Sequence, residues 1–143
     1  MKGSVIFIPF SDTLPGQSGQ LNASTRFRCY QNAKALRKLG WVCEIGTRDK
    51  LYELPNFDVA VFQKRYFTRD YELAKKFKGK IVLDLSDPDW ILFPKRKAMI
   101  DKMASIASII TTSSSKLANH FSHAGYKAVC ITEGFDFSTV PSN

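Results

Sequence analysis

Three carboxylates lie within six residues of one another, at Asp84, Asp87 and Asp89. They come at and after the end of the short apolar run 81–83, which is typical of a buried strand. Open parallel sheets bind ligands outside the carboxyl ends of their strands, so this acidic segment stands where chemistry is expected. Carboxylates this close repel one another. They therefore need arginines, backbone N–H groups, a cation or a hydroxyl-rich ligand nearby.

Two arginines, Arg26 and Arg28, fall near the first turn of a helix predicted over residues 23–39. Cations there oppose the helix dipole by about 0.3–1 kcal/mol each when exposed. An anion is therefore expected close by, either a ligand phosphate or the aspartates. In a 3-2-1-4-5-6 sheet the first and fourth strands are neighbours, which would let either arginine pair with Asp84 or Asp87. An internal ion pair that serves no ligand is an equally good interpretation.

Further polar residues follow other predicted strands. Lys64 and Arg65 come just past the third one and would add positive charge at the same edge of the sheet, unless they form a solvated turn. Ser113 precedes a predicted helix, where hydroxyls and free N–H groups can hold a phosphate or a sugar. The simpler role for Ser113 or its neighbour Ser114 is a helix N-cap.

The acidic segment has simpler interpretations as well. An aspartate, a proline and a second acid at 87–89 form an ordinary helix start. The D-x-D spacing also resembles a divalent-cation site, although two carboxylates without further ligands are a weak signal. His120 and His123, near the end of one predicted helix, offer too few ligands for a metal. We therefore expect no metal and no cofactor.

Bulk properties narrow the class of protein. A chain of 143 residues suits one domain, and its net charge of +8 favours anionic partners such as nucleotide phosphates, nucleic acid or an anionic bilayer. Three cysteines without C-x-x-C spacing indicate reduced thiols. We find no signal peptide, no apolar run of the roughly 18 residues that span a membrane, and no dinucleotide, P-loop, nucleophile-elbow or H-E-x-x-H motif. A cytoplasmic protein is expected, with contact to the inner face of the membrane as an option.

Apolar runs alternate with helical patterns along the chain. Strands are predicted over residues 5–10, 41–45, 58–62, the run from 80 into Asp84, 108–111 and 128–131, and helices over 23–39, 68–77, 95–107 and 113–124. This alternation predicts an α/β fold, a Rossmann-like three-layer sandwich with a mostly parallel six-stranded sheet. We expect this domain to occupy residues 1–134, with 135–143 as a linker.

The segment 90–97 joins an apolar half, 90–93, to the basic residues 95–97. Such a segment can rest on an anionic membrane, with its apolar side chains in the bilayer and its cations at the head groups. Burial of the apolar half in the domain core is the interpretation we favour from the sequence.

Several of these sequence segments follow one another in the order found in a known family. The chain resembles the N-terminal, acceptor-side domain of GT-B-type glycosyltransferases, of the group 1 (family 4-like) retaining enzymes. The similarity spans nearly the whole chain and rests on a first loop containing Gly16 and Gly19 and on the segments 23–28, 35–40, 61–65, 83–90, 111–118 and 131–136.

The resemblance implies a sugar transfer from a nucleotide-sugar donor to a sugar or lipid-linked acceptor, with no nucleic acid involved. The donor would bind mainly to a second, C-terminal domain that would follow the hinge-like Gly134-Phe135-Asp136, so this half would not be active alone. Gly16 and Gly19 would approach donor phosphates or acceptor, Arg26 and Arg28 would neutralise phosphate charge, and Asp84 and Asp87 would order acceptor hydroxyls.

Many members of that family carry a histidine near the end of the fourth strand, where this chain has Asp84. No catalytic residue is therefore assigned. The alternative to a glycosyltransferase half is a stand-alone, non-catalytic Rossmann-like binding or scaffold domain. A nicotinamide-binding oxidoreductase domain is disfavoured because the glycine fingerprint is missing.

Overall fold

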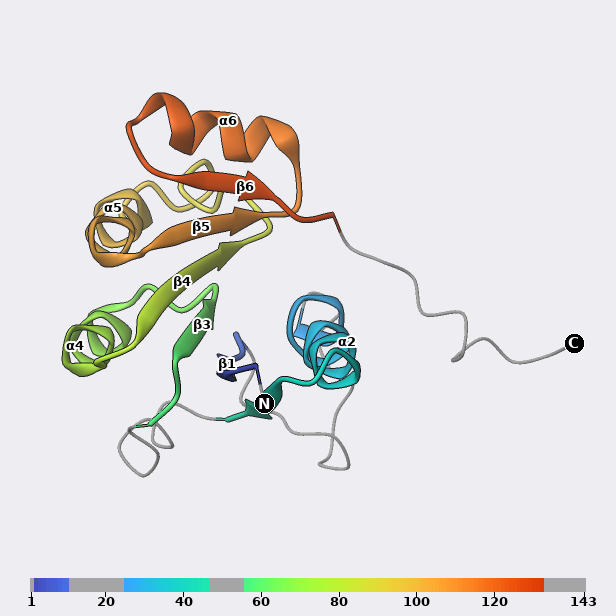
Figure 1. Cartoon of the computed structure of the whole chain (residues 1–143). Coiled ribbons are helices and arrows are strands. Elements are labelled where there is room, and N and C mark those ends of the chain that lie inside the picture. Colours follow the sequence, from blue (N-terminus) through green and yellow to red (C-terminus); the bar gives the residue numbers. More distant parts are fainter. Residues whose placement is uncertain (1, 11–24, 47–55, 133–143) are drawn as a thin grey trace, which may run out of the picture.

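The computed structural model describes residues 2–10, 25–46 and 56–132. The described chain is an α/β domain with one six-stranded, all-parallel sheet and helices on both of its faces, as the sequence predicts (Figure 1). The strands are β1 (Ser4–Ile8), β2 (Val42–Ile45), β3 (Val59–Gln63), β4 (Lys80–Leu85), β5 (Ile109–Thr112) and β6 (Ala128–Cys130).

The helices also lie where the sequence pattern placed them. They are η1 (Arg26–Gln31), α2 (Asn32–Lys38), α4 (Thr68–Lys76), α5 (Arg96–Ile106) and α6 (Ser115–His123). The first predicted helix is divided, because η1 is a π-helix that continues into α-helical α2. The segment Asp87–Asp89 does not begin a helix: turns follow Pro88, and α5 begins only at Arg96.

The order of the strands is β2-β1-β3-β4-β5-β6. The expected 3-2-1-4-5-6 order is therefore wrong, and β3 lies between β1 and β4. The chain leaves β1 in one direction, to β2, and leaves β3 in the other, through β4 and β5 to β6. Right-handed crossovers in opposite directions place their helices on opposite faces. Accordingly η1 and α2 lie on one face and α4 and α5 on the other (Figure 1).

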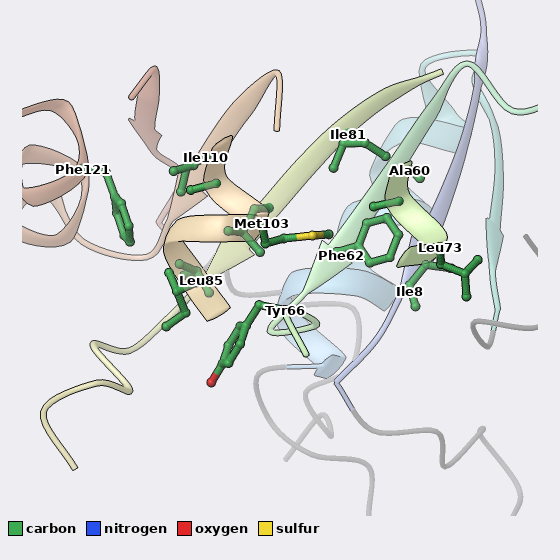
Figure 2. Packing of buried hydrophobic residues seen from close by; sticks show 14 of the residues in the cluster. Ile8, Ala60, Phe62, Tyr66, Leu73, Ile81, Leu85, Met103, Ile110 and Phe121 are labelled. Atoms are coloured by element: carbon green, nitrogen blue, oxygen red, sulfur yellow. The ribbon is translucent and has the colours of Figure 1, made fainter. Parts of the chain in front are cut away.

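The main core lies between the sheet and α4, α5 and α6. Alternate residues of the strands point to this face, and large apolar side chains from all three helices pack against them (Figure 2). Met103 and Ile100 of α5 and Phe121 of α6 are fully buried there with Phe62 and Leu83 of the sheet. This packing fixes the positions of the carboxyl ends of β3, β4 and β5.

The opposite face has a smaller core under η1 and α2, around Val5, Phe7, Cys29 and Ala33. Further along this face, toward β5, a cavity of about 360 Å³ remains between the sheet and α2. Apolar residues of the sheet and of α2 line most of it, with Arg28, Asp84 and Thr111 at its polar end. No helix in the described part of the chain is long and apolar enough to cross a membrane.

The apolar half of the segment 90–97 is only partly buried, so the burial favoured from the sequence is wrong for most of it. Trp90 packs against the main core and stacks on His120 with ring centroids 4.8 Å apart. Ile91, Leu92 and Phe93 are exposed.

Candidate functional site

The strand order changes direction between β1 and β3: the chain adds β2 on one side of this pair and β4 to β6 on the other. A ligand-binding crevice is therefore expected outside the carboxyl ends of β1 and β3. Pro9 and Phe10 follow β1 at this point, and Lys64 and Arg65 follow β3. The segment 11–24 that follows Phe10 lies outside the described residues, and with it Gly16 and Gly19.

A row of polar side chains crosses the end of the sheet on the face that carries η1. Gln63, Asp84 and Thr111 are in register on β3, β4 and β5, so their side chains share this face. All three are buried. Buried polar groups need hydrogen-bond partners. The partners of this row come from one another and from the beginning of the first helix.

Arg28 of η1 and Asp84 form the centre of the row. The Arg28 Nε lies 3.1 Å from Asp84 Oδ2, and Nη2 lies 2.5 Å from Oδ1. Thr111 donates a hydrogen bond of 2.6 Å to the same Oδ1, and Nη1 of the arginine donates to the Ile131 carbonyl. The exposed fractions are only 2% for Arg28 and 4% for Asp84. The predicted arginine–aspartate pair is therefore present, as an internal ion pair across β3.

Gln63 holds the same helix at a second point. Its Oε1 accepts hydrogen bonds from the Thr25 hydroxyl at 3.0 Å and from the Phe10 N–H at 2.7 Å. The Cys29 thiol lies 3.7 Å from this oxygen. Sequence reasoning missed Gln63, although a single polar residue at the end of an apolar strand was the available signal. Through Gln63, β3 fixes both the beginning of the loop after β1 and the start of the helix.

Burial raises the pKa of the Cys29 thiol, and the nearby Asp84 carboxylate raises it further. The three cysteines are free thiols, and Cys29 and Cys43 are buried. A thiol held protonated in this way is not a nucleophile. Cys29 therefore serves the packing of the smaller core.

Lys64 sits on the solvent side of this row. Its backbone has φ +53°, a left-handed conformation that residues other than glycine rarely adopt. Its Nζ lies 2.5 Å from Asp87 Oδ2, 3.9 Å from Asp89 Oδ1 and 5.5 Å from the centre of the Phe10 ring. Asp87 keeps 60% of its side chain exposed. We call Phe10, Lys64, Asp87 and Asp89 the rim site.

Asp89 connects the rim site to the core. Its Oδ2 accepts a hydrogen bond of 2.6 Å from the Tyr66 hydroxyl and lies 3.8 Å from Nη1 of Arg96. Burial raises the pKa of Tyr66, and the hydrogen bond to Asp89 adds to the increase. The tyrosine therefore remains a neutral donor at physiological pH and fixes the carboxylate of Asp89.

The other predicted site residues have structural partners. Arg65 is buried, and its Nε donates to the Pro9 carbonyl at 2.8 Å. The Ser113 hydroxyl donates to the Ser86 carbonyl at 2.9 Å, which joins the β5 and β4 loops. The N-cap of α6 is Ser114, whose Oγ accepts from the Leu117 N–H at 3.2 Å. Arg26 lies in η1, but its side chain is outside the described part of the structure.

Among residues 2–10, 25–46 and 56–132, no group of three histidine, cysteine or acidic side chains comes together as metal ligands would. The site thus consists of a buried, internally paired layer and a rim of mixed charge, in which Asp87 is exposed while Lys64 and Asp89 are mostly covered. The exposed carboxylate of Asp87 is the group that the rim offers most openly to a ligand.

No model of a known protein family matches this chain, and a comparison with curated proteins gave no match either.

Proposed function

We propose that this domain is the acceptor-binding half of a glycosyltransferase that takes its sugar from a nucleotide-sugar donor. The observation that carries the proposal is the rim site, which lies at the carboxyl end of the sheet, beside the reversal between β1 and β3. Ligands of open parallel sheets bind at this place. The order of sequence segments that resembles the acceptor-side domain of GT-B enzymes supports the same function.

The chemistry of the rim site suits a hydroxyl-rich acceptor. Carboxylates accept hydrogen bonds from sugar hydroxyls, an ammonium group donates to them, and an aromatic ring can cover the apolar face of a sugar. Asp87, Lys64 and Phe10 provide these three groups within one small region. Asp87 is the residue we assign to ordering acceptor hydroxyls, because most of its side chain is exposed.

Asp84 has a different role in this proposal. Both of its carboxylate oxygens are already occupied, by Arg28 and Thr111, and the residue is almost completely buried. It therefore acts as a positioning residue that fixes η1 over the sheet. Lys64, which follows β3, then has a rigidly held neighbour in β4.

The donor would bind mainly to a second domain, so this chain by itself should bind acceptor weakly and transfer nothing. The test is a titration of the 15N-labelled chain with a panel of neutral sugars and with nucleotide-sugars, followed by NMR. We expect shifts at millimolar sugar that are confined to Phe10, Lys64 and Asp87 and are lost in Asp87→Ala. Lys78→Ala, at the opposite edge of the sheet, should bind like the unchanged chain. Tight binding of a nucleotide-sugar, or sugar shifts elsewhere, would contradict the assignment.

A second candidate is a non-catalytic binding or scaffold domain. The full engagement of Asp84 with Arg28 and Thr111 favours it, because this buried carboxylate is then not free for chemistry. The same titration separates the two functions, since a scaffold domain should show no shift with any sugar.

A further inference from the structure

A second surface lies close to the rim site, two residues after Asp89. Ile91, Leu92 and Phe93 are consecutive, and their exposed fractions are 68%, 79% and 50%. We call these three residues the apolar tip. Exposed runs of apolar residues are disfavoured in water unless they have a binding role.

The apolar tip is held in place by its backbone. The Ile91 N–H donates to the Pro88 carbonyl at 3.0 Å, the Phe93 N–H to Asp89 at 2.9 Å and the Arg96 N–H to Phe93 at 2.9 Å. Trp90, immediately before the tip, is packed between His120 and Phe121, with ring-centroid distances of 4.8 and 5.7 Å. The fold therefore presents these apolar side chains to solvent on an ordered turn.

Cations surround the apolar tip. Lys95, Arg96 and Lys97 follow it directly, and the guanidinium of Arg96 lies 4.0 Å from the centre of the Phe93 ring. Lys116 of α6 lies across a small pocket that Ile91 and Trp90 also line. Within the described residues, Lys95 and Lys116 form no salt bridge, whereas Lys97 pairs with Asp101 at 2.6 Å.

Apart from the Lys97–Asp101 pair, these cations are placed unfavourably for the helix that they begin. Lys95 is the N-cap of α5, Arg96 and Lys97 lie in its first turn, and that turn contains no acidic residue. Positive charge at a helix N-terminus opposes the helix dipole. An arrangement that is unfavourable for the isolated helix is explained if an anionic surface faces this end of α5.

We propose that the apolar tip and its surrounding cations dock the domain on an anionic lipid bilayer. The three apolar side chains would enter the boundary between head groups and acyl chains, and Lys95 and Lys116 would contact lipid phosphates. The net charge of +8 adds a long-range attraction to such a surface. A bilayer fits better than a protein because three consecutive apolar side chains are exposed on a turn next to the exposed lysines Lys95 and Lys116. This inference does not depend on the proposed sugar-binding function.

The test is sedimentation of the full chain with phosphatidylcholine vesicles, with and without phosphatidylglycerol. We expect binding to the anionic vesicles only, weakened by salt. Leu92→Ser should weaken it by about tenfold, from the loss of one inserted leucine. Lys95→Glu should weaken it by at least about fivefold, from the loss of one lipid-facing cation.

Two matched controls lie at the opposite edge of the sheet, near the amino ends of the strands. Leu39→Ser removes another exposed leucine, which follows α2, and Lys78→Glu reverses an exposed charge before β4. Both should bind vesicles like the unchanged chain. Absence of binding to anionic vesicles, or equal losses in the tip and control variants, would overturn the proposal. The apolar tip would then belong to a protein interface. Circular dichroism of each variant shows that a loss of binding is not a loss of fold.

Discussion

Arg28 and Asp84 are 56 positions apart in the sequence, and the guanidinium of the first contacts both carboxylate oxygens of the second beneath the first helix. The pair connects η1 to β4 although β3 lies between β4 and the strand that leads into η1. One buried contact thus fastens the helix that carries Thr25 and Arg28 across three strands of the sheet.

Removing one member of this pair should destabilise the domain strongly. Asp84→Asn removes the carboxylate that pairs with the buried Arg28, and we expect a loss of about 3–5 kcal/mol in the free energy of unfolding, measured with urea. Asp101→Asn breaks the partly exposed Lys97–Asp101 pair and should lose only about 0.5 kcal/mol. The double variant Arg28→Met, Asp84→Leu should recover much of the loss. Similar losses in the two single variants would contradict the buried pairing.

Stability should fall at alkaline pH because of Cys29. Its pKa is raised in the folded chain, whereas the unfolded thiol ionises at its ordinary value of 9.0. Above that pH the unfolded chain has lost a proton that the folded chain retains, so the contribution present below pH 9.0 is lost as the pH rises toward the folded pKa. The expected slope is about −1.4 kcal/mol per pH unit from this thiol. Urea unfolding over a pH series should show a shallower slope for Cys29→Ala, and an unchanged slope would refute this account.

The left-handed backbone of Lys64 predicts a difference between two small residues. Lys64→Gly and Lys64→Ala both remove the contact with Asp87, but only glycine adopts φ +53° without strain. The glycine variant should therefore be more stable to urea than the alanine variant, by about 1 kcal/mol. Equal stabilities would mean that the residue does not hold this conformation in solution.

Gly79 marks a tight approach of two backbones before β4. A Cβ built there would lie 2.5 Å from the Asp58 carbonyl oxygen and 2.7 Å from that of Phe57. The Asp58 oxygen also accepts the Lys80 N–H at 2.9 Å, so it cannot move away freely. Gly79→Ala should lower the melting temperature, with a loss of about 2 kcal/mol. The neighbouring Lys78→Ala, at an exposed position, should leave it unchanged.

Much of this fold could be predicted from the sequence, because short apolar runs alternate with helical patterns and right-handed crossovers then leave few topologies. The predicted order of the strands differs from the observed order for a physical reason. Local periodicity shows that β2 and β3 exist, but whether the chain returns past β1 before β3 depends on which surfaces pack together.

The site was predicted in part for similar reasons. Asp84 and Arg28 could be matched because buried charges need partners. Gln63 carries no charge, and its role depends on its register with Asp84, which no local pattern reveals. The exposure of Leu92 could not be predicted either, since the sequence around an apolar residue in a turn does not show whether its side chain faces the core or the solvent.

The π-helical geometry of η1 has a consequence for how this chain can vary. A helix of this kind carries one more residue per turn than its α-helical continuation in α2. An α-helical turn closes with fewer residues, so deleting a single residue between Arg28 and Asn32 would let ordinary α-helical winding cover the same arc. Thr25 would still face Gln63, and Arg28 would still face Asp84. The length of this short stretch can therefore differ by one residue, whereas the side chains that it positions must stay.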